Sequence, residues 1–325
     1  MSGMSCHGAR GRLGWRCAMT DPTPSVAPSK ARVFVRRAGS TVVLWAVVGV
    51  VFASMRSWAY LGLLGLLTVV ATREYFQMLR AAGVRCFPRF GLGLAVGYCG
   101  VLHAGLLRNA EGILGGWDLF AVCVALIGAF ALEMRGPIRV LESLVAVTVT
   151  LCGFIYIAFL FNFGAKLLFL APGWQVGDGR VAQPAAVLLL WLLAVTKFTD
   201  MGAYLVGSLI GRHKLIPHVS PGKTWEGLGG ALAFSQLAGC GLYAALPQEL
   251  AVLGGWGHVV FLGLILAVLA VLGDLAESVV KRALQAKDSG QMLPGIGGAL
   301  DLIDSICFTA PALYFYLQWV LLPAS

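Results

Sequence analysis

Residues 257–275 read GHVVFLGLILAVLAVLGDL and decide the class of fold. A helix of about 20 apolar residues crosses the hydrocarbon core of a bilayer, and this run is long enough to do so. The rest of the 325-residue chain is similar, with 58% hydrophobic residues, 12% charged residues and a mean hydropathy of +0.83. Soluble domains carry about 25% charged residues. The composition therefore excludes an ordinary soluble protein and a disordered chain, and it predicts an all-α polytopic integral membrane protein.

Nine apolar runs are the candidate transmembrane helices, and the first two are short. With the N-terminus placed in the cytoplasm, 19 of the 24 Lys and Arg residues fall in inside segments and four in outside segments. This positive-inside bias supports a cytoplasmic N-terminus. It also explains the net charge of +9 without a nucleic-acid partner. The runs cover residues 41–55, 57–72, 90–107, 117–132, 142–163, 183–209, 225–245, 257–275 and 305–322.

The chain divides into three parts by the placement of its charges. Residues 1–37 are basic and rich in Gly, Pro and Ser, and we expect a disordered cytoplasmic tail there. Residues 38–182 are expected to form the N-terminal transmembrane helices. Residues 183–325 are expected to form a C-terminal transmembrane catalytic region with cytoplasmic loops at 211–224 and 276–304. Only in this last part do the acidic residues fall into helical register.

The segment 273–288, GDLAESVVKRALQAKD, carries a charged stripe where a span leaves the membrane. Its polar residues are spaced i, i+3, i+4 and i+7, so they share one face of a helix. A carboxylate near the membrane is costly unless it is paired or binds a metal. The stripe therefore favours a functional site, and the alternative is a helix that only carries i,i+4 ion pairs. The stripe consists of Asp274, Glu277, Ser278 and Lys281, extended by Arg282.

The next segment, LPGIGGALDLID at 293–304, combines a glycine-rich turn with two carboxylates. Gly295, Gly297 and Gly298 precede a new helix, whose first backbone N–H groups form a natural seat for an anion. Asp301 and Asp304 follow at i and i+3 on one face of that helix. Hard oxygen ligands beside a phosphate seat are typical of Mg²⁺. The segment therefore predicts a magnesium–phosphate site.

A third polar segment covers residues 197–230. Asp200 lies within a span, three residues after Lys197, which is expected to neutralise part of its charge. Ser220 followed by proline is typical of a helix cap, and this interpretation starts a helix around Lys223. The string Gly-Lys-Thr at 222–224 is not a P-loop, because that motif requires glycine at position 217, where this chain has proline.

These segments together resemble the phosphatidate cytidylyltransferases, also called CDP-diacylglycerol synthases. The stretch S-V-V-K-R-x4-K-D-S-G-x2-L-P-G-x-G-G-x-x-D-x-x-D, residues 278–304, is similar to the family signature. An upstream block is also similar, D-x-x-A-Y-x3-G-x3-G-R-x-K…S-P-x-K-T-x-E-G-x2-G-G, residues 200–230. Two positions depart from the usual pattern: Ile296 stands where the family has His, and Leu302 where it has Arg.

The resemblance implies transfer of the cytidylyl group of CTP to phosphatidic acid, giving CDP-diacylglycerol and pyrophosphate in phospholipid biosynthesis. It also implies Mg²⁺ as cofactor, a homodimer, and a multi-pass location in the inner (cytoplasmic) membrane. Whether a second cation such as K⁺ joins Mg²⁺ stays open at this stage. The implied metal ligands are Asp274, Asp301 and Asp304. The implied catalytic residues are Lys281, Arg282, Lys287 and Asp288. Substrate binding is expected at Ser220, Lys223, Thr224, Glu226, Ser278, Gly295, Gly297 and Gly298.

Other functions stay open at this stage. A CTP-dependent lipid kinase would use similar groups, and a diverged family member would use another lipid acceptor. A polytopic transporter would also place charges within its spans. Transporters are often built from internal repeats, whereas here the polar clusters all lie in the second half of the chain. The sequence therefore favours the enzyme.

Overall fold

The computed structural model describes residues 30–108, 111–171, 174–176, 179–286, 290 and 297–322. Within these ranges the chain is mainly helical, and seven helices are long and apolar enough to cross a membrane. The expected all-α polytopic fold is confirmed. The two apolar runs that do not reach this standard are the first two: the described apolar part of the first is only Val42–Ser54, and the second turns polar at its end.

The elements follow one another along the chain with short connections. The helices are α1 (Lys30–Ser54), α2 (Ser57–Ala81), α3 (Pro88–Leu107), α4 (Glu111–Glu133), α5 (Val140–Gly153), α6 (Phe163–Leu167), α7 (Gln183–Ile210), α8 (Trp225–Ala245), α9 (Trp256–Ala283) and α10 (Ala299–Tyr316). Shorter helical turns are η1 (Phe154–Phe159), η2 (Ala251–Leu253) and η3 (Leu317–Leu321). Two hairpins pair β1 (Gln175–Val176) with β2 (Arg180–Val181) and β3 (Lys214–Ile216) with β4 (Ser220–Thr224), both antiparallel.

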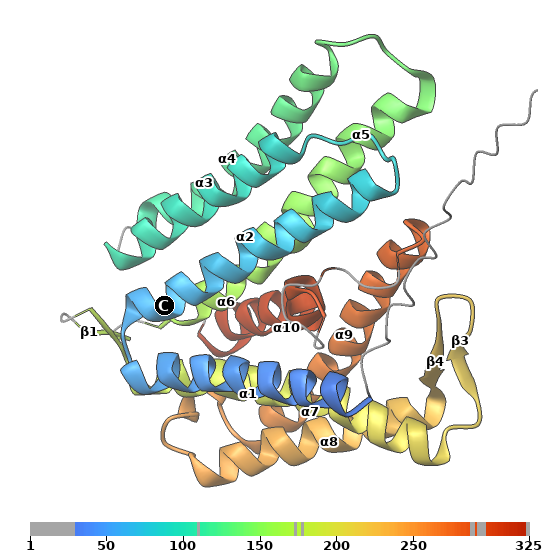
Figure 1. The fold of residues 1–325 in the computed structure, drawn as a ribbon. Helices are drawn as coiled ribbons and strands as arrows, with labels where there is room; N and C mark the ends of the chain where they lie inside the picture. Colours follow the sequence, from blue (N-terminus) through green and yellow to red (C-terminus); the bar gives the residue numbers. More distant parts are fainter. Residues whose placement is uncertain are drawn as a thin grey trace, which may run out of the picture.

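Helix α10 lies in the middle of the molecule, with α2 to α6 on one side and α1, α7 and α8 on the other (Figure 1). It packs against α2, α6, α7 and α9. Its start is apolar and fully enclosed, as Ala299 and Leu300 show. Any polar side chain on its first turns is therefore held among helices from both halves of the chain.

The helix pair α7–α8 crosses closely at two glycines. A Cβ on Gly230 would lie 2.6 Å from the carbonyl oxygen of Gly202 and 2.5 Å from the Cβ of Val206. A Cβ on Gly202 would meet the carbonyl of Gly230 at 2.5 Å. Small residues let helix backbones approach closely within a membrane. Here they bring the two helices that carry the predicted residues 197–226 into direct contact.

We expect Gly230→Ala to destabilise the protein by about 1–3 kcal/mol, because backbone atoms cannot move aside for the new methyl group. The matched control is Gly229→Ala, since Gly229 is exposed and a Cβ there would meet nothing within 4 Å. That change should stabilise α8 slightly, because alanine favours helix over glycine. Thermal unfolding of the two variants in detergent compares them, and equal melting temperatures would contradict the prediction.

The segment 211–224 is a β-hairpin that ends in a helix cap, and the helix interpretation around Ser220 is wrong. Residues 220–224 form strand β4, and α8 begins only at Trp225. Thr224 is the residue that caps it: its hydroxyl oxygen accepts a hydrogen bond from the N–H of Gly227 at 3.0 Å. Proline is tolerated in β4 because a two-stranded hairpin leaves one edge of each strand unpaired.

The structure also shows where the expected parts of the chain begin and end. Residues 1–29 of the expected tail lie outside the described residues, and α1 starts at Lys30. The expected cytoplasmic loop 276–304 begins within α9 and ends within α10. Its centre, including Lys287, Asp288, Gly295 and Ile296, lies outside the described residues.

Candidate active site

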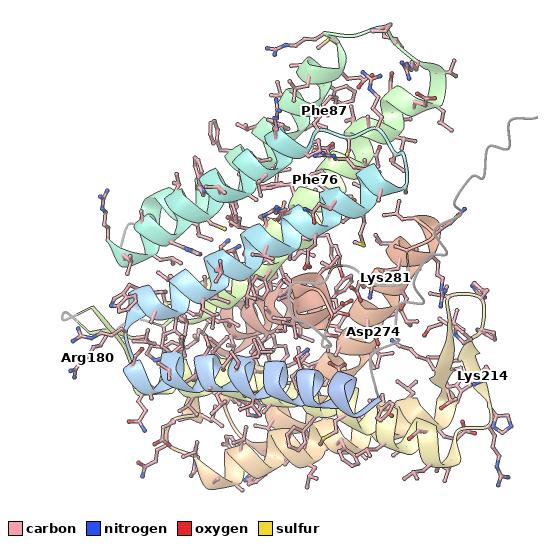
Figure 2. All side chains as sticks on the ribbon, viewed as in Figure 1. Phe76, Phe87, Arg180, Lys214, Asp274 and Lys281 are labelled. Carbon is pink, nitrogen blue, oxygen red and sulfur yellow. The ribbon has the colours of Figure 1, made fainter. Side chains whose placement is uncertain are left out.

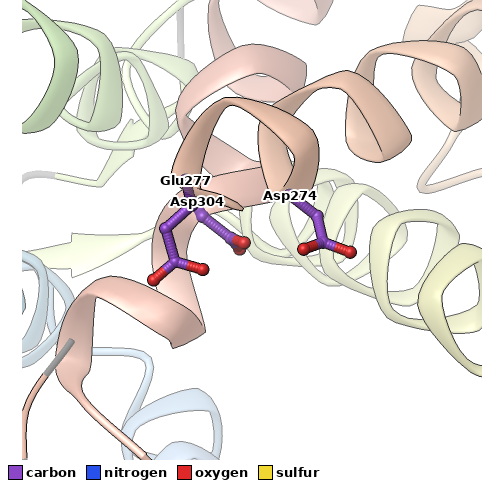
Figure 3. Close-up of side chains that lie close together, drawn as sticks. All are labelled: Asp274, Glu277 and Asp304. Atoms are coloured by element: carbon purple, nitrogen blue, oxygen red, sulfur yellow. The ribbon is translucent and has the colours of Figure 1, made fainter. Parts of the chain in front are cut away.

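Three carboxylates meet where α9 packs against α10. One oxygen from each of Asp274, Glu277 and Asp304 lies within 4.8 Å of the others. The first two are three residues apart on one face of α9, and the third is on the second turn of α10 (Figure 3). Glu277 and Asp304 are almost fully buried. Carboxylates this close and this buried repel one another unless positive charge compensates them or one of them is protonated.

A glycine makes this meeting of helices possible. A Cβ on Gly273 would lie 2.7 Å from the carbonyl oxygen of Asp304 and 2.8 Å from the Cα of Ser305. Any larger residue would push α9 and α10 apart at the level of the carboxylates. The backbone of α10 therefore rests directly on α9, and this contact sets the spacing of Asp274 and Asp304.

Lysines pair with the carboxylates from two directions. Lys281, one turn after Glu277 on α9, lies 3.0 Å from it and also forms an ion pair with Asp301. Lys223, from β4, lies 2.9 Å from Asp274. Figure 2 shows that Asp274 and Lys281 lie along the same helix. The predicted stripe on α9 is therefore part of a network that reaches the hairpin and α10.

A third lysine approaches from α7. Nζ of Lys197 lies 3.5 Å from Asp200 and donates a hydrogen bond to the carbonyl oxygen of Leu302 at 3.1 Å. Leu302 is one of the two positions that depart from the family signature, where the family has Arg. In this structure a cation from another helix, Lys197, lies beside it. Five carboxylates on α7, α9 and α10 lie beside three lysines in the described part of this region, so acidic groups outnumber basic ones. The carboxylates are Asp200, Asp274, Glu277, Asp301 and Asp304, and the lysines are Lys197, Lys223 and Lys281.

The carboxylate cluster fits a divalent cation. Oε1 of Glu277 is buried and makes no hydrogen bond with the described residues, although a buried carboxylate oxygen normally has a partner. Mg²⁺ prefers one or two carboxylates together with phosphate oxygens and water, and the cluster offers such carboxylates. Asp274 is the most exposed of the three and faces the pocket described next.

A pocket of about 350 Å³ opens beside Asp274, between α7, the β3–β4 hairpin, α8 and α9. Ser220, Lys223 and Thr224, which were expected to bind substrate, all line it, and so does Asp200. The pocket thus joins two carboxylates to a lysine and four hydroxyl-bearing side chains, since Tyr204 and Ser208 also line it. This is the combination that a nucleoside triphosphate with its cation requires.

Comparison with known proteins places these features in a family. A model of the cytidylyltransferase family matches residues 35–320, which is most of the chain. The chain belongs to the cytidylyltransferase family. It is similar to the phosphatidate cytidylyltransferase of Synechocystis sp., with 29% identity over 310 residues that cover 86% of this chain and 96% of the relative.

Two further relatives extend the comparison. The phosphatidate cytidylyltransferase of Brucella suis is 47% identical over 129 residues, which cover 39% of this chain and 46% of that protein. The chain thus aligns with about half the length of the Brucella relative. The Escherichia coli protein named "Uncharacterized protein YnbB" is 32% identical over 266 residues, covering 81% of this chain and 80% of that protein.

In this member of the family, the start of α10 is held by two carboxylates. Asp301 accepts the N–H of Gly298 at 2.7 Å, and Glu74, from α2, accepts the N–H of Leu300 at 3.1 Å. Gly297 has a φ of +118°, which favours glycine. The N–H groups expected to bind an anion at Gly298 and Leu300 are thus donated to protein carboxylates. The predicted roles of Gly297 and Gly298 in substrate binding, and of Asp301 at the metal, stay predictions.

Glu74 is the site residue that sequence reasoning missed. It lies in the first half of the chain, where the acidic residues do not fall into helical register, yet it is 5% exposed. Its only sequence signal is a carboxylate at the end of a long apolar segment, two residues before Phe-Gln-Met. Contact with α10, more than 200 residues later, arises from the packing of α2 against α10.

We expect Glu74→Ala to cost about 1–3 kcal/mol of stability, because the N–H of Leu300 loses its partner in a buried place. The start of α10 should also shift, which would lower turnover by about 10-fold, a usual effect of losing an outer-shell contact. Glu74→Gln keeps an acceptor oxygen and should retain most of the stability. Equal melting temperatures for the alanine variant and the unaltered protein would show that Glu74 does not hold α10.

The other predicted residues lie at the margin of the site or outside the described residues. Glu226 accepts hydrogen bonds from the backbone and ring of His213, so it ties α8 to the hairpin. Ser278 is half-buried on α9 and makes no hydrogen bond with the described residues, and Arg282 is exposed. Lys287, Asp288 and Gly295 lie outside the described residues.

Proposed function

We propose that this protein is a phosphatidate cytidylyltransferase that acts at the cytoplasmic face of the inner membrane. The observation that carries the proposal is the cluster of Asp274, Glu277 and Asp304, which three lysines surround within membrane-spanning helices beside a polar pocket. The names of the Synechocystis and Brucella relatives support it. The substrates would be CTP and phosphatidic acid, and the products CDP-diacylglycerol and pyrophosphate.

Mg²⁺ would be held by Asp274, Glu277 and Asp304, whose buried oxygens supply the hard ligands that it prefers. When bound, it would neutralise charge on the phosphates of CTP. Asp301 is the further candidate that the resemblance implies. In the structure its carboxylate pairs with Lys281 and the N–H of Gly298, so this role requires those contacts to open.

The reaction needs positioning and charge neutralisation more than proton transfer. The phosphate of phosphatidic acid has a second pKa of about 6, so at neutral pH it is mostly ionised and attacks without a general base. Its oxygen forms a bond to the α-phosphorus of CTP, and the bond from that phosphorus to the pyrophosphate breaks. Lys223, in the polar pocket, would hold CTP phosphates, and Lys281 would keep Glu277 in place.

The test uses detergent-purified protein, phosphatidic acid, Mg²⁺ and CTP labelled at the α-phosphate. Label should enter the lipid phase as CDP-diacylglycerol, depend on Mg²⁺ and not arise from labelled ATP. A parallel reaction with γ-labelled CTP and diacylglycerol detects a CTP-dependent lipid kinase. Label in the lipid of the second reaction alone would overturn the proposal and favour the lipid kinase. Label in the lipid of neither reaction would overturn it and favour the transporter.

The finer expectations about partners and location are part of this proposal. A second cation such as K⁺, a homodimer, the lack of a nucleic-acid partner and the inner membrane itself stay predictions. Light scattering of the purified protein in detergent measures the oligomeric state. Activity assays in Mg²⁺ buffers with and without K⁺ measure the need for a second cation.

A further inference from the structure

A second, apolar pocket of about 250 Å³ lies between α1, α2, α7 and α10. Leu189, Leu193 and Lys197 line it from α7 at i, i+4 and i+8, so they form one continuous face of that helix. Leu302 and Ile306 line it from α10. Among its described lining residues, Lys197 alone is charged. The pocket is therefore an apolar space with an ammonium group at one end.

The charged end of this apolar pocket touches the carboxylate network. Nζ of Lys197 contacts Asp200 at 3.5 Å and the carbonyl of Leu302 at 3.1 Å. Leu302 lies between Asp301 and Asp304 in the sequence and lines the apolar pocket. An ammonium group has three N–H donors, and these two contacts leave one donor for another acceptor. A charge within membrane-spanning helices usually marks a substrate path.

One wall of the apolar pocket packs loosely. Trp45 and Val48 line it from α1, and the contacts of α1 are mainly with α2. Trp45 is 55% exposed and lies in the apolar part of α1, Val42–Ser54, so an apolar surface is open beside the pocket. In the view of Figure 1, α1 is drawn across α7, and residues of both helices line the pocket. An amphiphile from the bilayer therefore meets this pocket without crossing the packed core.

We propose that the apolar pocket holds an acyl chain of phosphatidic acid and that Lys197, at its charged end, binds the lipid phosphate next to the carboxylate cluster. The inference rests on the proposed function, since it assigns the lipid substrate of that reaction to a place. The polar pocket beside Asp274 then remains for CTP. The two pockets follow one another along the same face of α7, the apolar one at residues 189–197 and the polar one at residues 200–208. Lys197 is a substrate-positioning residue in this arrangement.

The first test separates lipid binding from nucleotide binding. Lys197→Met should raise the KM for phosphatidic acid about 10-fold or more, because a charge-assisted contact is lost, while the KM for CTP changes less than about twofold. Lys197→Arg should retain a KM near that of the unaltered protein. Leu302→Arg, in the Lys197→Met background, brings a cation to the same pocket and should recover part of the affinity. Equal changes in both KM values, or no change, would overturn the role of Lys197.

The second test measures the length of the chain that the pocket accepts. Leu193→Trp fills the pocket one helical turn beyond Lys197 and should lower turnover of dihexadecanoyl phosphatidic acid about 10-fold, with little effect on the dioctanoyl lipid. The control is Leu190→Trp, because Leu190 is 37% exposed and does not line the pocket. Equal losses with both lipids, or no loss with either, would overturn the acyl-chain assignment.

A binding measurement keeps this inference distinct from the proposed function. Native mass spectrometry of the detergent-purified protein counts bound dihexadecanoyl phosphatidic acid without CTP. If the unaltered protein binds this lipid, and Lys197→Met and Leu193→Trp each reduce binding, the pocket assignment holds even where no CDP-diacylglycerol forms. If the unaltered protein makes CDP-diacylglycerol and both variants bind and turn over the lipid normally, the pocket assignment fails and the proposed function stands.

Discussion

Asp304→Asn is expected to lower cytidylyl transfer by at least about 100-fold and to leave the protein folded. The carboxylate of Asp304 is 5% exposed and lies against Asp274 and Glu277. Water therefore does not solvate it, and we expect it to bind the cation. Asparagine keeps the oxygen that accepts the N–H of Ser305 at 2.6 Å. Loss of one of several crowded negative charges should leave the melting temperature equal or higher. We therefore expect Asp304→Asn to lose activity and to keep its stability.

The measurement is initial rate against Mg²⁺ concentration, together with thermal unfolding in detergent. Glu142→Gln is the matched control, because Glu142 is exposed and pairs only with Arg139 among the described residues. Asp301→Asn tests the other implied metal ligand. A shift in Mg²⁺ dependence like that of Asp304→Asn would show that Asp301 binds the metal. An unchanged Mg²⁺ dependence would show that Asp301 serves only as the ion-pair partner of Lys281. Near-normal activity of Asp304→Asn would remove the cluster from the mechanism.

Lys281→Met is expected to have the second large effect, on stability as well as on rate. Lys281 pairs with both Glu277 and Asp301, and its loss would leave two carboxylates without their partner inside the helix bundle. Removing one member of a buried ion pair costs about 3–5 kcal/mol. Methionine has a similar length and keeps the packing of the aliphatic part, so the effect reports the charge.

Arg282→Met is the matched control for stability, since Arg282 is the next residue and is exposed, and it should change the free energy of unfolding by less than about 0.5 kcal/mol. The double variant Lys281→Met/Asp301→Asn should recover part of the lost stability without recovering activity. Melting temperatures that are the same for Lys281→Met and the unaltered protein would show that the ion pairs of Lys281 do not support the fold.

Local patterns in the sequence were enough to find one wall of the site. Asp274, Glu277 and Lys281 were predicted to share a helix face, and they do, because the geometry of a single helix follows from residue spacing. Asp304 was predicted to belong to the same site, and its place on α10 next to α9 agrees with this. The all-α membrane fold likewise followed from apolar runs, because a bilayer requires helices of a known length.

The nearest neighbours of each carboxylate could not be predicted in the same way. Asp301 was grouped with the metal ligands, whereas in the structure it pairs with Lys281 and caps α10. Glu277 was expected only on the charged face, and it lies within the carboxylate cluster. Whether Asp301 or Glu277 joins the carboxylate cluster depends on how α10 is rotated against α9. The close contact of α10 with Gly273 fixes this rotation.

The sequence by itself determined the membrane class and the polar segments of the second half of the chain, and the orientation of the helices stays a prediction. These are properties of single segments, which hydropathy, charge bias and helical spacing encode directly. Only the tertiary structure decided that Glu74 holds α10, that Lys197 lies beside Leu302, and that an apolar pocket ends at this lysine. Each of these joins segments about 100 or more residues apart. Such contacts arise from the packing of whole helices, and no local pattern of residues specifies them.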